Sequence, residues 1–435
     1  MSPAPGFEQW LAPAPASAGG RLDWLQTQRA AARLSVAAQG VPGTKQEAWR
    51  YTSLSRLLEQ GFVPAVEPVT LRPEALEPRL IPELDAYRVV LVNGRFVPGL
   101  SALEGLPPGV RVGSLAELLA TDPDALKDRL NAVAGPDQSL FTALNTAGLD
   151  DGLVAIMGPG VCLPRPIELI HLSVGAAAPL LAQPRHLVVL ETGAQAHLIE
   201  RYVGLTDGLY CTNSVLEVML GADAVLEHQR VQLESPKAFH LAALYVRLGA
   251  ASNYRCINIA VGAAWARTDL RVRFTGEDAV CDLQGLYLVG ERQLLDIHLD
   301  VDHQVPRCRS REYFKGILYG KGRAVFDGRV HVARDAQQTD AAMTNRNLVL
   351  CEGAEIDTKP QLEIEADDVK CSHGTTVGEL DPEQLFYLRS RGIGAPLARR
   401  MLCLGFAAEV LDALGPEALR MHVAEEVGHR LEQAT

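Results

Sequence analysis

Two side chains that bind soft metal ions stand two positions apart in the last third of the sequence. Cys371 and His373 lie within the segment Asp368–Gly378, and residues two apart on an extended strand point to the same side. A thiolate and an imidazole on one face can hold iron or zinc, or the edge of an iron–sulfur cluster. Two ligands do not complete such a site. The other ligands must therefore come from neighbouring strands or from a partner protein.

A second polar cluster has the same two-residue spacing. His298, Asp300 and Asp302 would share one face of a strand, where an imidazole and two carboxylates could bind a cation. Alternating polar residues are also typical of the solvated face of any strand, so both interpretations stay open. Other histidines, such as His228 and His240, fall singly on predicted strands and are interpreted as structural.

Several catalytic motifs are missing from the sequence. It has no Gly-x-x-x-x-Gly-Lys-Ser/Thr, and the nearest string, 316–322, has the wrong spacing and lacks the hydroxyl residue that would hold magnesium. It also has no Gly-x-Ser-x-Gly and no His-Glu-x-x-His. Nothing in it resembles a Rossmann fingerprint after a first strand. We therefore predict that the chain does not hydrolyse ATP or transfer hydride by itself.

The two candidate clusters fall in a region of repeated short strands. From about residue 152, strands of five to nine residues alternate with turns, and the turn glycines Gly193, Gly221, Gly249 and Gly276 recur at intervals of 28, 28 and 27 residues. Such a period without helices predicts stacked β-coils, with glycine at the tight corners. Looser spacing further on implies inserted residues, which we place within 290–312. The prediction is a β-solenoid core over 151–380, and a large antiparallel sandwich is the alternative.

Helical regions are predicted on both sides of this core. Residues 1–150 read as mostly helical, with a small hairpin turning at Asn93-Gly94. The region 381–435 begins at Asp381, a good N-cap followed by proline. It contains three predicted helices, at 382–391, 395–413 and 416–432. We expect these helices to form a docking surface, to seal the end of the solenoid, or to do both.

The length, charge and cysteine content of the chain exclude several classes of function. The chain has 435 residues and a net charge of −12, which argues against nucleic-acid binding because that requires a concentrated basic face. The first twenty residues lack the features of a secretory signal, and no stretch is long and apolar enough to span a bilayer. The eight cysteines form no Cys-x-x-Cys pair. We therefore expect a cytoplasmic protein without structural disulfides.

Several segments together resemble a known family. The strings Asn-Arg-Asn-Leu-Val-Leu from 345, Cys-Ser-His-Gly-Thr-Thr from 371 and Leu-Phe-Tyr-Leu-Arg-Ser-Arg-Gly-Ile from 385 stand in fixed order, and Lys-Gln-Glu-Ala-Trp-Arg-Tyr-Thr from 45 adds an N-terminal motif. They resemble SufD-type proteins of the SufB/SufD family, which belong to the SufBCD iron–sulfur cluster assembly complex. The Cys-Ser-His-Gly string favours SufD over SufB, which carries a Glu-His-Glu-Ala-Thr-like string there.

The resemblance implies a fold, partners and a site. It implies a right-handed parallel β-helix that pairs with a SufB-type paralogue and docks a SufC-type ATPase on its C-terminal helices. It also implies that His373, and with it Cys371, lies near the interface with SufB, where a nascent cluster or iron would be held transiently. No stably bound cofactor is expected, and the isolated chain could form a homodimer.

The leading hypothesis is therefore a non-catalytic scaffold subunit for iron–sulfur cluster assembly. One alternative is a SufB-like paralogue that acts as the cluster scaffold itself. Another is a β-helix enzyme that acts on polysaccharides, which the lack of a secretion signal disfavours. We also expect the Cys371–His373 strand to be buried, which disfavours an exposed catalytic cleft.

Overall fold

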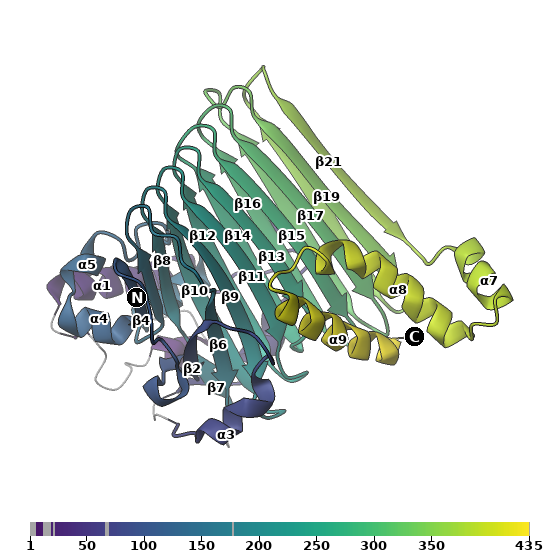
Figure 1. The fold of residues 1–435 in the computed structure, drawn as a ribbon, viewed down its shortest axis with the longest axis horizontal. Helices are drawn as coiled ribbons and strands as arrows, with labels where there is room; N and C mark the ends of the chain where they lie inside the picture. Colours follow the sequence, from purple (N-terminus) through teal and green to yellow (C-terminus); the bar gives the residue numbers. More distant parts are fainter. Residues whose placement is uncertain (1–5, 12–18, 21, 66–68, 176–177, 435) are drawn as a thin grey trace.

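Between residues 153 and 378 the described chain winds as a parallel β-solenoid (Figure 1). The computed structural model describes residues 6–11, 19–20, 22–65, 69–175 and 178–434. Successive strands alternate between two sheets, so each coil contributes one strand to each sheet. The predicted parallel β-helix with helical regions on both sides is confirmed.

The two sheets, called sheet A and sheet B, face each other across the interior. The solenoid strands of sheet A are β5 (Leu153–Met157), β8 (Arg185–Leu190), β10 (Tyr210–Leu220), β12 (Phe239–Leu248), β14 (Trp265–Phe274), β16 (Leu294–His303), β18 (Arg323–Val332) and β20 (Glu355–Ile364). Those of sheet B are β6 (Ile167–Ser173), β9 (Gln195–Gly204), β11 (Val225–Leu233), β13 (Asn253–Ala260), β15 (Val280–Val289), β17 (Arg309–Leu318), β19 (Asp340–Val349) and β21 (Lys370–Gly378). The short strands β1 (Val63–Pro64) and β7 (Leu180–Ala182) join the side of sheet A.

The glycine period corresponds to the length of a coil. Val225 pairs with Asn253, 28 residues later. A Cβ added at Gly276 would lie 2.0 Å from the backbone nitrogen of Ala250, so the stacked corners leave no room for a side chain there. The placement of the inserted residues within 290–312 was largely wrong. The coil reaches its greatest lengths later, at 31 residues from Arg309 to Asp340 and 32 from Arg323 to Glu355, because the connection between β18 and β19 is longer than the other connections between the long strands.

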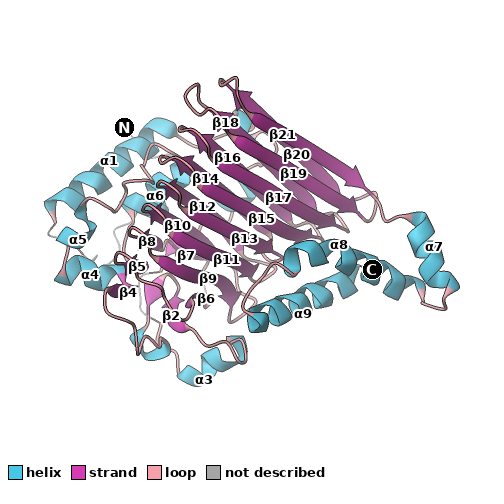
Figure 2. Cartoon of the chain, turned by 45° about the horizontal axis from the view of Figure 1, so that its top comes forward, coloured by secondary structure: helices cyan, strands magenta, loops and turns pink. Residues whose placement is uncertain are grey.

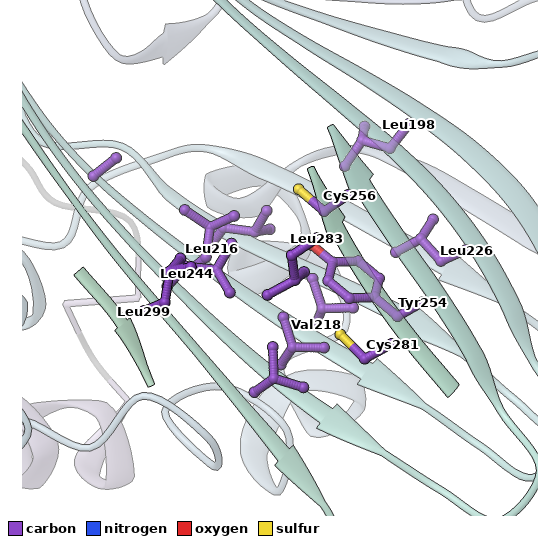
Figure 3. Packing of buried hydrophobic residues seen from close by; sticks show 14 of the residues in the cluster. Leu198, Leu216, Val218, Leu226, Leu244, Tyr254, Cys256, Cys281, Leu283 and Leu299 are labelled. Atoms are coloured by element: carbon purple, nitrogen blue, oxygen red, sulfur yellow. The ribbon is translucent and has the colours of Figure 1, made fainter. Parts of the chain in front are cut away.

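Side chains that pair in register form rows along the interior. Because side chains alternate along a strand, every second residue points inward and stacks on its counterparts in the coils on either side. Figure 3 shows this packing around Leu198, Leu226, Tyr254 and Leu283, all of which are buried. A position in one coil therefore predicts which residues lie above and below it.

The N-terminal region covers the outer face of sheet A near its first strands. Aromatic and aliphatic residues, among them Trp10 and Phe141, pack onto the outward-facing Phe239 and Trp265. The helices of this region are α1 (Asp23–Gln39), α2 (Ser55–Leu58), α3 (Pro73–Leu76), α4 (Leu115–Thr121), α5 (Asp124–Lys127) and α6 (Leu140–Ala147), with 3-10 turns at Glu8–Leu11, Glu47–Trp49, Glu77–Arg79 and Pro98–Leu100.

Strands from the same region close the first end of the solenoid. β2 (Tyr87–Val92) pairs in parallel with β6 and returns through a hairpin to β3 (Arg95–Phe96). The hairpin turn has positive φ at both Asn93 and Gly94, as the sequence predicted. β4 (Val110–Ser114) pairs antiparallel with β5 and covers that edge of sheet A.

Of the three C-terminal helices, the last two lie against the outer face of sheet B, whereas the first projects from the body, and the last coil is left uncovered (Figures 1 and 2). They are α7 (Pro382–Ser390), α8 (Ala395–Leu411) and α9 (Glu417–Ala434), close to the predicted bounds. Val410 of α8 and Val423 of α9 pack onto outward residues of sheet B such as Ile257 and Ile317. The expectation that these helices seal the solenoid end was wrong, because their apolar faces fit the side of the sheet. None of the helices among the described residues is long and apolar enough to cross a membrane.

Candidate functional site

The register places both candidate metal ligands at interior positions of the last coil. On β21, Cys371 pairs with Ala341 and His373 pairs with Met343. Ala341 and Met343 are buried interior residues of the preceding coil. Cys371 and His373 therefore lie on the inward-facing side of β21, as their spacing predicted.

No further coil follows β21 in the described chain, and this changes the surroundings of the two ligands. His373 is exposed, whereas Cys371 is half-buried and packs against the interior hydrophobic cluster. The expectation that this strand is buried was wrong, because an interior position is covered only when another coil stacks on it. Burial raises the pKa of the Cys371 thiol above its ordinary value. The thiol is therefore protonated at neutral pH, and a metal ion would have to displace its proton.

The last strand of sheet A, β20, faces β21 across the interior, and these two strands together form the open end of the solenoid. The hydroxyl oxygens of Thr358 on β20 and Thr375 on β21 lie 3.1 Å apart, so the two strands approach each other across the interior. Thr358 also donates to the Oδ1 atom of buried Asn345, at 3.0 Å, in the coil beneath. The apolar side chains of Ile364 and Val377 are 41% and 54% exposed, respectively. The end is thus an ordered surface of interior-type side chains on which no coil of the described chain stacks.

The helix that follows is similarly uncovered. The Asp381 carboxylate caps α7 by accepting from the Glu383 backbone N–H at 2.8 Å, as predicted. The apolar side chains of α7 do not pack into the core: Phe386 is 74% exposed and Tyr387 57%. They line an open groove of about 880 Å³ between α7 and α8. This groove lies beyond β21 along the chain, on the helix that projects from the body of the molecule (Figure 1).

The second predicted cluster faces outward on sheet A and is occupied by ion pairs. His298 lies 2.9 Å from a carboxylate oxygen of Asp296. Asp300 pairs with Arg329 at 2.9 Å, and Asp302 pairs with Arg273 at 3.0 Å. His298, Asp300 and Asp302 share a face, but among the described residues they do not converge into a three-ligand group. This geometry favours the interpretation of a solvated, charge-paired strand face.

Sequence reasoning missed a buried polar cluster in the early coils. Glu200 of β9 accepts from Arg230 at 2.7 Å and from Tyr202 at 2.5 Å, and it lies 3.4 Å from His171 and 3.3 Å from His228. All five side chains are buried. Burial favours the neutral form of Glu200, but Arg230 and the two histidines outweigh it and hold the pKa of Glu200 well below its usual range.

One group within this cluster has the composition of a metal site. Ligand atoms of His171, His186 and Glu200 all lie within 4.8 Å of one another. However, the Leu153 backbone N–H donates to Nδ1 of His186 at 2.9 Å. In a neutral imidazole the proton then resides on Nε2, which is buried without a hydrogen-bond partner among the described residues, and burial keeps the pKa of His186 well below its ordinary value. A metal-bound histidine normally donates through its other nitrogen. The Leu153 contact thus leaves the neutral His186 ring without a free lone pair for a metal ion, which disfavours a metal site here.

Comparison with known proteins identifies the family. The family model described as SUF system FeS cluster assembly, SufBD core domain, matches residues 173–406, and the SufBD protein N-terminal region matches residues 18–169. The iron–sulfur cluster assembly protein SufD of Escherichia coli is 35% identical over 395 residues, which is 90% of each chain. The chain belongs to the SufBD family of iron–sulfur cluster assembly proteins.

Other SufBD relatives extend this likeness. An iron–sulfur cluster assembly SufBD family protein of Synechocystis is 35% identical over 398 residues, covering 90% of this chain and 87% of the relative. One from Mycobacterium leprae is 30% identical over 428 residues, covering 95% and 96%. These two matches cover 90% and 95% of the chain. The resemblance stated from the sequence is confirmed at the level of the family, and the chain is an iron–sulfur cluster assembly protein.

Proposed function

We propose that this SufBD protein is a non-catalytic scaffold subunit of an ATP-dependent iron–sulfur cluster assembly complex. In this proposal it pairs through the open end of its solenoid with a SufB-type paralogue. The observation that carries the proposal is the uncovered last coil, in which interior-type side chains and two strand edges face outward. Iron or a nascent cluster is the cargo of such a complex and is held only transiently.

The open end has the properties of an interface. Strands at the edge of a sheet present unpaired backbone groups, and natural proteins cover or block them. A solenoid needs a terminal cap for the same reason. Here β2, β3 and β4 cover the first end, while the C-terminal helices lie on the side of sheet B. A paralogue with coils of the same width would continue both sheets and bury Ile364 and Val377.

The candidate ligands lie at this proposed junction. Cys371 offers a thiol and His373 an imidazole, which suit iron and the edge of a cluster. No third ligand joins them among the described residues. A partner that stacks on β21 would bring its own side chains close to both. The site is thus proposed as one half of a shared, transient site.

The exposed groove of α7 and α8 supports the second part of the proposal, the docking of a SufC-type ATPase. Phe386 and Tyr387 expose large apolar surfaces beside each other, and aromatic residues of this kind are typical anchors of protein interfaces. α8 reaches the solenoid through Lys315 of β17, whose ammonium group lies 2.9 Å from the Glu409 carboxylate. This contact gives a route by which movement of a docked ATPase would reach the last coils.

The test is co-expression of the chain with SufB-type and SufC-type proteins, followed by affinity purification. We expect all three to co-purify. The double variant Ile364→Asp/Val377→Asp should lose the SufB-type protein, whereas Phe386→Asp/Tyr387→Asp should lose the ATPase and keep the paralogue. If both variants retain both partners, neither surface is an interface of the complex.

The same edge predicts behaviour of the chain alone. Without a paralogue, a second copy of the chain can cover the open end and form a homodimer. Sedimentation of the isolated chain measures this directly. We expect Ile364→Asp/Val377→Asp to shift the chain toward a monomer, and Phe386→Asp/Tyr387→Asp to leave the sedimentation unchanged.

A further inference from the structure

A cleft of about 380 Å³ lies on the outer face of sheet A, between the segment 131–138 and the strands β12 and β14. Its volume falls within the range of small-molecule pockets. The charged side chains that line it are four arginines and two aspartates: Arg247, Arg271, Arg273, Arg329, Asp300 and Asp302. The cleft is separate from the open end and from the α7 groove.

The aspartates neutralise only two of the arginines. Asp302 pairs with Arg273, and Asp300 pairs with Arg329. Among the described residues Arg247 forms no ion pair, and its guanidinium contacts the sulfur of Met219 at 3.5 Å. Arg271 likewise forms no ion pair there and donates to the side chain and backbone oxygens of Gln138, at 2.5 and 3.1 Å. The lining therefore has two more arginines than carboxylates, and Glu363, outside the cleft, pairs with Arg329 as well.

The register makes this charge unusual. Arg247 and Arg273 are direct partners on neighbouring strands, so their Cβ atoms lie about 4.8 Å apart. Like charges directly opposite each other destabilise a sheet. The chain as a whole has a net charge of −12, so the cleft differs from the average surface. Asp302 compensates Arg273, whereas no carboxylate among the described residues pairs with Arg247, so an anion between the two guanidinium groups would supply the missing negative charge.

The wall opposite the arginines is held firmly. Backbone N–H groups of Asn131, Val133 and Ala134 donate to the Glu217 carboxylate at 2.7, 2.9 and 3.0 Å. Glu217 is fully buried and pairs with Arg185, which is also fully buried, at 2.9 Å. Because this wall is already fixed, it would lose little conformational entropy when a ligand binds.

We propose that this cleft binds the diphosphate group of a small phosphorylated molecule, with Arg247 and Arg273 as the principal donors and Arg271 beside them. Planar guanidinium groups bind phosphoryl oxygens through paired hydrogen bonds. Two neighbouring guanidinium groups match the two phosphoryl groups of a diphosphate. A ligand with a single carboxylate would leave one of the two guanidinium groups without an anionic partner. This inference does not depend on the proposed partners of the open end.

The test is isothermal titration calorimetry of the purified full-length chain with inorganic pyrophosphate and with ADP at low ionic strength. We expect Arg247→Ala to weaken binding about tenfold or more, as expected when charge-assisted hydrogen bonds are lost. Arg273→Ala should weaken it further because it also frees the Asp302 carboxylate. Arg247→Lys, which keeps the charge but not the planar fork, should fall between wild type and Arg247→Ala. Binding should weaken as salt is added.

The matched control is Arg309→Ala, which removes an exposed strand arginine from sheet B. It should bind both probes like the wild type, and circular dichroism should show that every variant is folded. Tighter binding of ADP than of pyrophosphate would assign a nucleotide-like ligand, and equal binding would assign a free diphosphate. The proposal is overturned if neither probe binds the wild type, or if Arg309→Ala loses as much affinity as Arg247→Ala.

Discussion

Two histidines occupy the same interior row of sheet B, one in a coil that is covered on both sides and the other in the last coil. The row runs in register through His228, Cys256, Leu283, Glu312, Met343 and His373. His228 is fully buried, 3.3 Å from the Glu200 carboxylate and 3.0 Å from the Tyr254 hydroxyl. His373 is exposed at the open end. The backbone position is equivalent, and only the presence of a covering coil differs.

The difference shows that coverage decides what an interior polar residue does in this fold. A buried histidine must have its nitrogens matched by protein groups, because an unmatched polar group in the interior is costly. His228 is accordingly committed to its neighbours and contributes to stability. His373 bears no such constraint, which is consistent with the shared site proposed for it at the open end. Glu312 lies between the two cases, because it is buried beside the Ser310 hydroxyl but forms no ion pair among the described residues.

The largest effect should come from breaking the buried cluster. Glu200→Ala removes the carboxylate that compensates Arg230, leaving a guanidinium buried and unpaired. We expect a loss of about 3–5 kcal/mol in the free energy of unfolding, the usual cost of stranding one partner of a buried ion pair. Urea denaturation followed by circular dichroism measures this loss.

Glu363 supplies the control for that change. It pairs with Arg329 on the exposed side of β20 at 2.7 Å, and surface pairs contribute less than about 1 kcal/mol. Glu363→Ala should therefore leave the urea midpoint nearly unchanged. Equal losses for the two variants would mean that burial does not separate the two regions of the molecule.

Glu312 should make stability depend on pH. Its carboxylate forms no ion pair among the described residues, and burial raises the pKa of Glu312 to about 8, although the Ser310 hydroxyl and the Arg311 charge oppose this rise. Between about pH 5 and pH 8 the unfolded chain has released this proton while the folded chain keeps it. Linkage then lowers the free energy of unfolding by about 1.4 kcal/mol for each pH unit in this window.

The variant Glu312→Gln removes that dependence. The introduced amide side chain does not titrate, so the stability difference between variant and wild type should change in favour of the variant as pH rises from about 5 to about 8. Urea denaturation at several pH values gives the slope of this difference. Glu379→Gln, at an exposed position after β21, is the control. A difference that stays flat with pH would place a compensating charge beside Glu312.

The solenoid and its helices could be predicted because their signals are local. The glycine spacing gave the coil length, Asn93-Gly94 gave a hairpin, and Asp381 with the proline after it gave the start of α7. Each of these depends on backbone geometry within a few residues or on one repeated interval. The extra residues of the last coils were misplaced because the repeat weakens where the connections lengthen.

The surroundings of the site residues could not be predicted in the same way, because they depend on what stacks against each strand. The spacing of Cys371 and His373 gave their common face, but not that this face lies open. The helix predicted at 382–391 likewise did not reveal that Phe386 stays largely exposed. The Glu200 cluster did leave a signal, since His228 and Arg230 follow Glu200 by one coil length, 28 and 30 residues later. A search for polar residues at the repeat interval would have found it.

The smallest effect on stability should occur at His373, and this sharpens the comparison with His228. His373→Ala removes an exposed side chain, so the free energy of unfolding should change by less than about 0.5 kcal/mol. His228→Ala should cost about 1–3 kcal/mol because it leaves Glu200 and Tyr254 short of a partner. For cluster formation on the proposed complex, we expect His373 to matter more than its small effect on stability indicates. There, His373→Ala should lower the iron and cluster content measured by absorption after anaerobic reconstitution, while assembly itself is unchanged. If His373→Ala prevents assembly, or if its cluster yield equals that of the wild type, the proposed role of His373 in a shared site is contradicted. The exposure of an interior position would then not be enough to indicate a functional residue.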